Sequence, residues 1–175
     1  RRTAGFCDQL KADGHEDRVR ELTGLRLDPY FSATKLSWIK KQEPNVWAGV
    51  ESGRTAIGTI DSYLIARMTR GVTHVTDASN ASRTLLFDIS TGEWSQELCD
   101  LFGVPIEALP EVVPSYGQVG TTDPASFAGL ELPIAGIAGD QQAALFGQAC
   151  FEVGSSKCTY GTGAFLVANV GAAPV

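Results

Sequence analysis

One segment near the end of the chain passes directly from a strand-like pattern into helix-forming residues. Residues 132–139 are small or apolar and carry no charge, and residues 143–146 (Ala-Ala-Leu-Phe) favour a helix. In open α/β sheets, ligands bind where the chain leaves a strand and enters the next helix. Gly139 lets the backbone turn and lets a ligand approach it closely. The pattern predicts an α/β fold in which the carboxylate of Asp140, beside Gln141, points into a crevice.

Two roles are open for Asp140 on this pattern. An aspartate just before a helix is most often an N-cap, whose oxygen accepts a hydrogen bond from an unpaired backbone N–H group. A carboxylate in a crevice can instead act as a general base. A capping carboxylate stays ionised and oriented, so the two roles can be combined. The local sequence favours the cap, and the choice depends on the rest of the chain.

The overall composition narrows the class of protein. With 175 residues, the chain has room for one domain and the beginning of another. Its formal net charge of −6 argues against a surface that binds nucleic acid. No apolar run reaches the length that spans a bilayer. Cys7, Cys99, Cys150 and Cys158 are widely spaced without a CxxC pattern, which favours free thiols and a reducing cytoplasm.

Hydrophobic spacing predicts several helices. The helical patterns cover residues 2–12, 15–23, 34–41, 62–69 and 94–102. Gly24 and Gly103 are placed to end two of these helices. Ser32 and Asp61 are placed to cap two others. Within the first two patterns, the candidate core residues are Leu10, Val19 and Leu22.

Two single strands and one hairpin are expected from the sequence. Residues 56–60 and 85–89 have the composition of short strands. Residues 154–160 and 164–170 are rich in strand formers and are joined by Gly161-Thr162-Gly163, which predicts a hairpin with a tight turn. The N–H groups and the threonine hydroxyl of such a loop suit phosphate oxygens, although a plain hairpin turn explains the glycines equally well. The loop matches neither a Walker motif nor a dinucleotide fingerprint.

Two further segments could line a ligand site. Pro29 restricts the turn at residues 28–32, so Tyr30 could offer its hydroxyl to a polyol with Phe31 behind it. A purely structural contact between Tyr30 and Pro29 is the alternative. Residues 77–83 form a polar stretch that is either a loop lining a cleft or a capped turn.

Together these motifs resemble the FGGY family of carbohydrate kinases, in the actin/hexokinase-like ATPase superfamily. The matching blocks occur in the family's order at residues 30–42, 59–65, 76–84, 136–147 and 159–165. The sequences DPYFS and GIAGDQQAALFGQ are similar to the glycerol-phosphorylating branch. The resemblance implies a partial ribonuclease H-like α/β domain with the opening β-hairpin of a second such domain. Residues 1–150 would belong to the substrate-side domain and residues 151–175 to the nucleotide-side domain.

The resemblance also implies a role for each site residue. Asp140 corresponds to the catalytic base that takes a proton from the attacking glycerol hydroxyl, with a possible indirect contact to a metal ion. Tyr30 and Gln141 correspond to contacts with glycerol hydroxyls, and Phe165 to the apolar wall against the glycerol carbons. Thr162, with Gly161 and Gly163, corresponds to the contact with the nucleotide phosphates. The implied substrates are glycerol and ATP with Mg²⁺, and the implied full-length protein is a cytoplasmic homo-oligomer.

The chain also departs from the family pattern. The phosphate-binding strand–turn, the Arg-Glu glycerol pair and most of the second domain of the family are not found in this sequence. We therefore expect the 175-residue chain by itself to lack kinase activity. Two alternatives to the glycerol-phosphorylating function remain. One is phosphorylation of another polyol or sugar within the same family, and the other is a non-catalytic module that binds polyols or nucleotides.

Residues 129–131 suggest a difference in regulation. Bacterial relatives that fructose 1,6-bisphosphate inhibits carry Gly-Thr-Arg before the strand that leads to the catalytic aspartate. The corresponding residues here are Gly129, Leu130 and Glu131. A glutamate in place of a phosphate-binding arginine repels the anionic ligand. We expect the full-length protein to be insensitive to this inhibitor.

Overall fold

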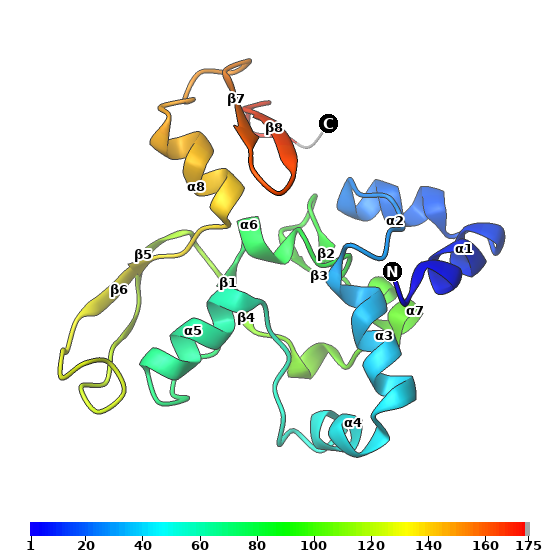
Figure 1. The fold of residues 1–175 in the computed structure, drawn as a ribbon, viewed down its shortest axis with the longest axis horizontal. Coiled ribbons are helices and arrows are strands. Elements are labelled where there is room, and N and C mark those ends of the chain that lie inside the picture. The colour runs from blue at the N-terminus through cyan, green and yellow to red at the C-terminus, as the bar shows by residue number, and fades with distance from the viewer. Residues whose placement is uncertain (174–175) are drawn as a thin grey trace. The chain divides into compact units, whose positions relative to one another are not determined.

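The computed structural model describes residues 1–173 and divides into two units, Arg1–Ile137 and Ala138–Val175. One part of the first unit is helical, and its helices appear together in Figure 1. They are α1 (Ala4–Ala12), α2 (Glu16–Thr23), α3 (Ser32–Gln42), α4 (Pro44–Glu51) and α7 (Gln96–Phe102). Their apolar faces enclose one core, and Val19, Leu27 and Leu98 are among its most buried side chains.

The boundaries of the first helices follow from their sequence. Gly24 ends α2 in the left-handed conformation with φ of 69°, which a residue without Cβ adopts at little cost. Gly103 ends α7 in the same way with φ of 67°. Leu10, Val19 and Leu22 are all buried, so the predicted apolar face is confirmed.

A short parallel strand pair lies at the centre of the first unit. Strand β1 (Val75–Asp77) follows helix α5 (Ile60–Met68) and pairs with β4 (Glu111–Val113). All three residues of β1 are buried, as expected for a parallel strand covered on both faces. Helix α6 (Ala78–Ala81) begins directly after β1. A second, smaller core forms here around Ile65, Val75 and Ile137.

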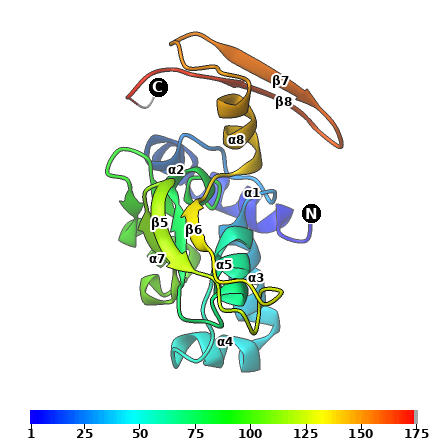
Figure 2. The same ribbon diagram turned by 90° about the vertical axis from the view of Figure 1, so that its left-hand side faces the viewer.

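Two antiparallel pairs complete the first unit, with a 3₁₀ turn at Ile106–Ala108. Strands β2 (Phe87–Asp88) and β3 (Glu93–Trp94) form a minimal ladder. Strands β5 (Tyr116–Thr121) and β6 (Pro133–Gly136) form a longer one, seen in Figure 2. Its register shifts between Tyr116 and Gly120.

The described part of the second unit, residues 138–173, contains one helix and one hairpin. Helix α8 (Asp140–Gly147) packs against strands β7 (Ser156–Tyr160) and β8 (Ala164–Ala168), as Figure 2 shows. The strands pair in register from Ser156↔Ala168 to Tyr160↔Ala164, so residues 161–163 form the connecting loop. The predicted hairpin and its glycine-containing turn are confirmed.

The strand predicted at residues 56–60 is wrong. These residues are extended at first, but they join no ladder, and Ile60 already begins α5. Their hydrogen bonds go elsewhere: the Ile57 N–H donates to the Ala108 carbonyl at 2.8 Å, and the Ile57 carbonyl bonds Nε2 of His74 at 2.9 Å. Because a strand needs a neighbouring strand, local β-propensity was insufficient here.

The strand predicted at residues 85–89 is shorter than expected. Leu85 adopts a left-handed φ of 66°, which takes it out of the extended conformation. Leu85 and Leu86 are almost completely buried and pack into the helical core. Only Phe87 and Asp88 pair with β3, which includes Trp94, so α7 begins later than predicted, at Gln96.

Both predicted side-chain caps are also wrong. Phe31 occupies the N-cap position of α3, and Ser32 is the first helical residue. Thr59 occupies the N-cap position of α5, and Asp61 lies inside the first turn. Its Oδ2 accepts a hydrogen bond from the Thr76 hydroxyl at 2.8 Å. A carboxylate in the first turn still interacts favourably with the positive end of the helix dipole.

Candidate active site

Asp140 is the first residue of α8. Gly139 occupies the N-cap position with extended backbone angles, so Asp140 is not the N-cap residue itself. The exposed carboxylate accepts a hydrogen bond through Oδ1 from the Gln141 N–H at 2.8 Å. This bond holds the side chain at the positive end of the helix, where a negative charge is favoured. The carboxylate is therefore oriented, and a ligand could approach it from solvent.

Gln141 is connected to the hairpin. Its side-chain carbonyl Oε1 accepts a hydrogen bond from the ammonium group of Lys157 on β7. The same ammonium donates to the Thr159 hydroxyl at 2.7 Å. Lys157 itself is only 3% exposed, and its contact with Gln141 on α8 is part-buried. The structure thus joins the first turn of α8 to the hairpin through side chains.

Phe165 lies on the same face of the hairpin as this contact. It is directly opposite Thr159 in the ladder, and Lys157 is directly opposite Val167. These four residues form the less exposed face of the hairpin, because side chains alternate along each strand. Phe165 therefore shares a face with the lysine that holds Gln141.

Close packing accounts for one of the two glycines in the hairpin loop. A Cβ atom at position 163 would lie 2.8 Å from Cε2 of Phe165, whereas a Cβ atom at position 161 would meet nothing within 4 Å. The Gly161 N–H donates to the Gly163 carbonyl at 3.0 Å, and Thr162 is exposed at the tip. Gly163 thus leaves room for the aromatic ring, and the loop presents its threonine to solvent.

Tyr30 belongs to the first unit, whereas Asp140, Gln141, Thr162 and Phe165 belong to the second. Its side chain is 63% exposed, and its ring packs edge-on against Phe31 with centroids 5.3 Å apart. The turn before it is an Asx turn in which the Tyr30 N–H donates to Oδ1 of Asp28 at 2.7 Å. The local structure therefore presents the tyrosine to solvent.

The polar stretch at residues 77–83 is a capped turn. Asp77 is completely buried and accepts hydrogen bonds from the Ser79 and Ser115 hydroxyls, both at 2.6 Å. It also accepts from the backbone and side-chain N–H groups of Asn80, at 3.0 and 2.8 Å. Burial acts to raise the pKa of Asp77, but these hydrogen bonds outweigh it and hold the pKa below its ordinary value. Since Ser115 follows β4, the network ties together the ends of the two parallel strands.

Lys157 and Thr159 were not singled out from the sequence. The only available signal was the alternation of β7, which places a lysine at an inward position two residues before an inward threonine. A lysine in a strand is usually exposed, so this signal is weak without the helix that covers it.

The described residues 1–173 contain no group of three or more His, Cys, Asp or Glu side chains that could hold a metal ion. Mg²⁺ is usually held by one or two carboxylates together with substrate phosphates and water. The exposed carboxylate of Asp140 fits such a partial role.

In the part of the chain that the structure describes, every helix falls short of the length and apolarity needed to cross a bilayer.

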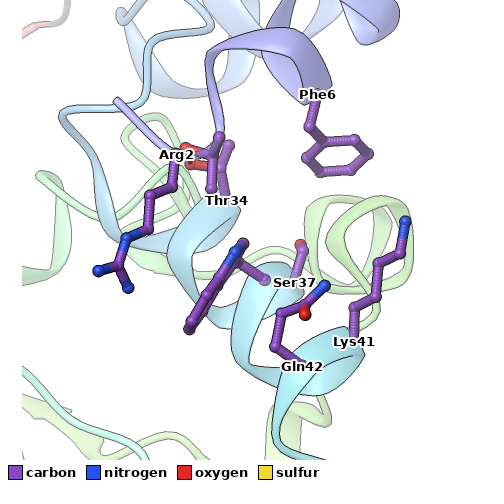
Figure 3. Close-up of a pocket in the computed structure, with 8 residues that line it drawn as sticks. Arg2, Phe6, Thr34, Ser37, Lys41 and Gln42 are labelled. Atoms are coloured by element: carbon purple, nitrogen blue, oxygen red, sulfur yellow. Dashed lines mark hydrogen bonds between the residues drawn. The ribbon is translucent and has the colours of Figure 1, made fainter.

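A cavity of about 490 Å³ lies between α1 and α3 in the first unit (Figure 3). Its lining combines two cations, Arg2 and Lys41, with the aromatic rings of Phe6 and Trp38. The Arg2 guanidinium lies 5.1 Å from the centroid of the Trp38 ring. None of the predicted site residues is among those that line this cavity.

The chain is similar to several glycerol kinases over its whole length. It is 57% identical to the glycerol kinase of Methylobacterium nodulans and 54% identical to that of Oceanobacillus iheyensis. Each alignment covers 100% of this chain and 35% of the relative. The chain thus spans about a third of the length of these relatives.

Solved structures show the same fold. A crystal structure of Plasmodium falciparum glycerol kinase with ADP matches 95% of this chain and 33% of its own, at 36% identity and a TM-score of 0.89. The xylulose kinase of Lactobacillus acidophilus matches 93% of this chain and 33% of its own, at 20% identity and a TM-score of 0.78. The expected mixed α/β fold of the actin-like ATPases is confirmed. Residues 1–147 match the N-terminal domain of the FGGY family of carbohydrate kinases, and the chain belongs to that family.

Proposed function

We propose that the whole protein transfers the γ-phosphoryl group of ATP to glycerol and forms sn-glycerol 3-phosphate. The observation that carries this proposal is the 57% identity to a glycerol kinase over all 175 residues. The match to a glycerol kinase structure with ADP supports a nucleotide as the second substrate. Because the chain spans 35% of the bacterial relative, the activity is proposed for the whole protein.

Asp140 acts as the general base in this proposal. As a glycerol hydroxyl oxygen attacks the γ-phosphorus, its proton passes to the Asp140 carboxylate. The bond from the γ-phosphorus to the bridging oxygen breaks, and ADP leaves. The exposed, oriented carboxylate at the start of α8 supports this role. General-base assistance of this kind is worth about 10²–10⁴-fold in rate.

The remaining residues position the two substrates. Tyr30 and Gln141 bind glycerol hydroxyls, and the ring of Phe165 packs against the glycerol carbons. Thr162, with the backbone of Gly161 and Gly163, binds nucleotide phosphate oxygens. The exposed threonine at the loop tip supports this assignment. Phosphoryl transfer depends mainly on such positioning and on charge stabilisation.

Mg²⁺ bound to the nucleotide neutralises charge on the phosphates. Asp140 is the residue of this chain that would contact the hydrated ion indirectly.

Residues 1–150 are proposed as part of the substrate-side domain and residues 151–175 as the start of the nucleotide-side domain. A cytoplasmic location and self-association of the whole protein complete the proposal. The first of these is supported by the four free cysteines.

The test compares the whole protein with its Asp140→Asn variant. We expect ATP-dependent phosphorylation of glycerol by the wild type and a loss of about 10²–10⁴-fold in kcat for the variant, because asparagine cannot accept the proton. The unfolding temperature should remain close to that of the wild type, since the amide oxygen can still accept the Gln141 N–H. An unchanged kcat would remove Asp140 from the mechanism.

Two further measurements separate the alternatives. If other polyols or sugars are phosphorylated with higher kcat/KM than glycerol, the whole protein is a different kinase of the same family. If it binds glycerol or ADP without turnover, it is a binding module. The purified 175-residue chain should show no glycerol-dependent ATP turnover, because it spans only about a third of its relatives.

Glu131 is the basis for a proposal on regulation. The residue is exposed and follows a turn in which the Leu130 N–H donates to the Phe127 carbonyl at 2.8 Å. Its negative charge is expected to keep fructose 1,6-bisphosphate from binding at this turn. The whole protein should retain full activity in millimolar bisphosphate. Inhibition of the wild type that is lost on mutation near Glu131, as in a Glu131→Gln variant, would contradict the proposal.

A further inference from the structure

Lys157 is a buried lysine on the less exposed face of β7. It is only 3% exposed on the inward face of β7, opposite Val167. Lysine is almost never this buried unless its charge is paired, because desolvation of an ammonium group is costly. In the part of the chain that the structure describes, Lys157 takes part in no ion pair. Its two hydrogen-bond acceptors are the neutral oxygens of Gln141 and Thr159.

The chemistry of the ammonium group fixes the orientation of the Gln141 side chain. An ammonium group can only donate hydrogen bonds, whereas a carboxamide has one accepting oxygen and one donating nitrogen. The Gln141 oxygen must therefore face Lys157, which agrees with the observed bond to Oε1. The opposite orientation would bring two sets of donors together. The Nε2 group of Gln141 is consequently directed away from Lys157.

The backbone and side chain of Gln141 are thus held by different partners. Its N–H donates to Oδ1 of Asp140 at 2.8 Å, and its side-chain oxygen accepts from Lys157. The Thr159 hydroxyl, 2.7 Å from the ammonium nitrogen, keeps the lysine in place. This arrangement leaves the Nε2 group as the part of Gln141 that can meet a ligand.

We infer that Lys157 is a positioning residue, which sets the carboxamide of Gln141 so that it recognises a substrate hydroxyl only by donating a hydrogen bond. The inference rests on the proposed role of Gln141 in binding glycerol. A hydroxyl that accepts from Nε2 of Gln141 keeps its own proton for donation to another group. Such a hydroxyl is in the correct state to give its proton to a carboxylate. Lys157 therefore acts on the substrate through Gln141, without touching it.

The experiment measures glycerol and ATP kinetics in four forms of the whole protein: wild type, Lys157→Met, Gln141→Leu and the double variant. Methionine fills a similar volume but donates no hydrogen bond. Each single variant should raise the KM for glycerol about tenfold, the size of one lost hydrogen bond. The KM for ATP should change by less than about twofold. The double variant should be no worse than Gln141→Leu, because both changes remove the same oriented contact.

Gln141→Glu tests the orientation directly and keeps the fold intact. A carboxylate can accept from Lys157 as well as a carboxamide can, so the unfolding temperature should be unchanged or higher. It has no N–H group for the ligand, so the KM for glycerol should rise about tenfold or more. Lys157→Arg, which keeps a donor at this position, should recover part of the glycerol affinity. Cys158→Ser, one residue away on the opposite face of β7, is the matched control and should behave as wild type.

The outcomes separate this inference from the proposed function. If the wild type phosphorylates glycerol but Lys157→Met keeps the wild-type KM for glycerol, the inference is wrong and the proposed function stands. Multiplicative losses in the double variant would likewise overturn it, because they would show that Lys157 acts independently of Gln141. If Lys157→Met fails to fold, a normal glycerol KM in Gln141→Glu overturns the inference by itself. A wild type without glycerol phosphorylation would overturn both.

Discussion

Among the described residues, each unit buries one charged side chain, and these two side chains have different hydrogen-bond partners. Asp77 in the first unit is completely buried and accepts four hydrogen bonds from Ser79, Ser115 and Asn80. Lys157 in the second unit is 3% exposed and donates to Gln141 and Thr159. The Asp77 partners hold the ends of two parallel strands. A partner of Lys157 is the residue next to the proposed catalytic base.

This difference distinguishes a structural charge from a functional one. Asp77 has its acceptor capacity filled by its own neighbours, so its network serves the local fold. The charge of Lys157 has no ion-pair partner among the described residues. We infer that Lys157 instead orients the side chain of Gln141, which can contact a ligand. We therefore expect changes at Asp77 to appear in stability and changes at Lys157 to appear in glycerol affinity. Two predictions test the network around Asp77, and a third tests the packing around Phe165 in the second unit.

The largest effect is expected for Asp77→Ala. The change removes the buried carboxylate that accepts four hydrogen bonds, two from hydroxyl groups and two from Asn80. We expect the free energy of unfolding to fall by about 3 kcal/mol, as measured by urea denaturation of the whole protein. Asp77→Asn is the matched variant and should lose only about 1 kcal/mol, because its oxygen still accepts from Asn80. A change in glycerol KM without a loss of stability would contradict the comparison.

The same network should also make stability depend on pH, and this effect is expected to be smaller. The pKa of Asp77 is lower in the folded protein than its ordinary value of 3.8, so the ionised form stabilises the fold. That stabilisation is fully present above pH 3.8 and is lost as the pH falls through the folded pKa. The stability difference between wild type and Asp77→Asn should therefore be constant near neutral pH and should shrink below pH 3.8. A difference that grows on acidification would contradict this assignment.

The smallest effect is expected from the two loop glycines of the second unit. Gly163→Ala would place a Cβ atom 2.8 Å from the Phe165 ring, whereas Gly161→Ala would meet nothing within 4 Å. Neither glycine has a positive φ, so the backbone tolerates alanine at both positions. Gly163→Ala should displace the ring and lower the free energy of unfolding by about 1 kcal/mol, with a higher glycerol KM. Equal behaviour of the two variants would show that Phe165 does not depend on this space.

Local sequence signals were sufficient to predict much of the fold. Gly24 and Gly103 end their helices in the left-handed conformation, as expected from glycine at those positions. The hairpin strands and the loop at residues 161–163 also follow from local composition, because a tight turn brings adjacent strands together. The prediction of a strand at residues 56–60 was wrong. A strand must pair with a segment that can be distant in the sequence, and these residues join no ladder.

The site was predictable only in part. The prominence of Asp140 came from its place between a small apolar segment and a helix, and the structure confirms that it begins α8. The family resemblance, and not local spacing, supplied the roles of Tyr30 and Phe165, and these roles stay predictions. Lys157 was missed because its importance depends on burial under α8, which no local pattern encodes.

The in-register pairing of β7 and β8 has a consequence for how this region can vary in length. Lys157 and Thr159 reach α8 because they are two residues apart on a strand whose side chains alternate. One residue inserted between them would send one of the two to the opposite face, where Cys158 now lies. Insertions and deletions within β7 should therefore be excluded among functional descendants of this protein, even where substitutions are accepted.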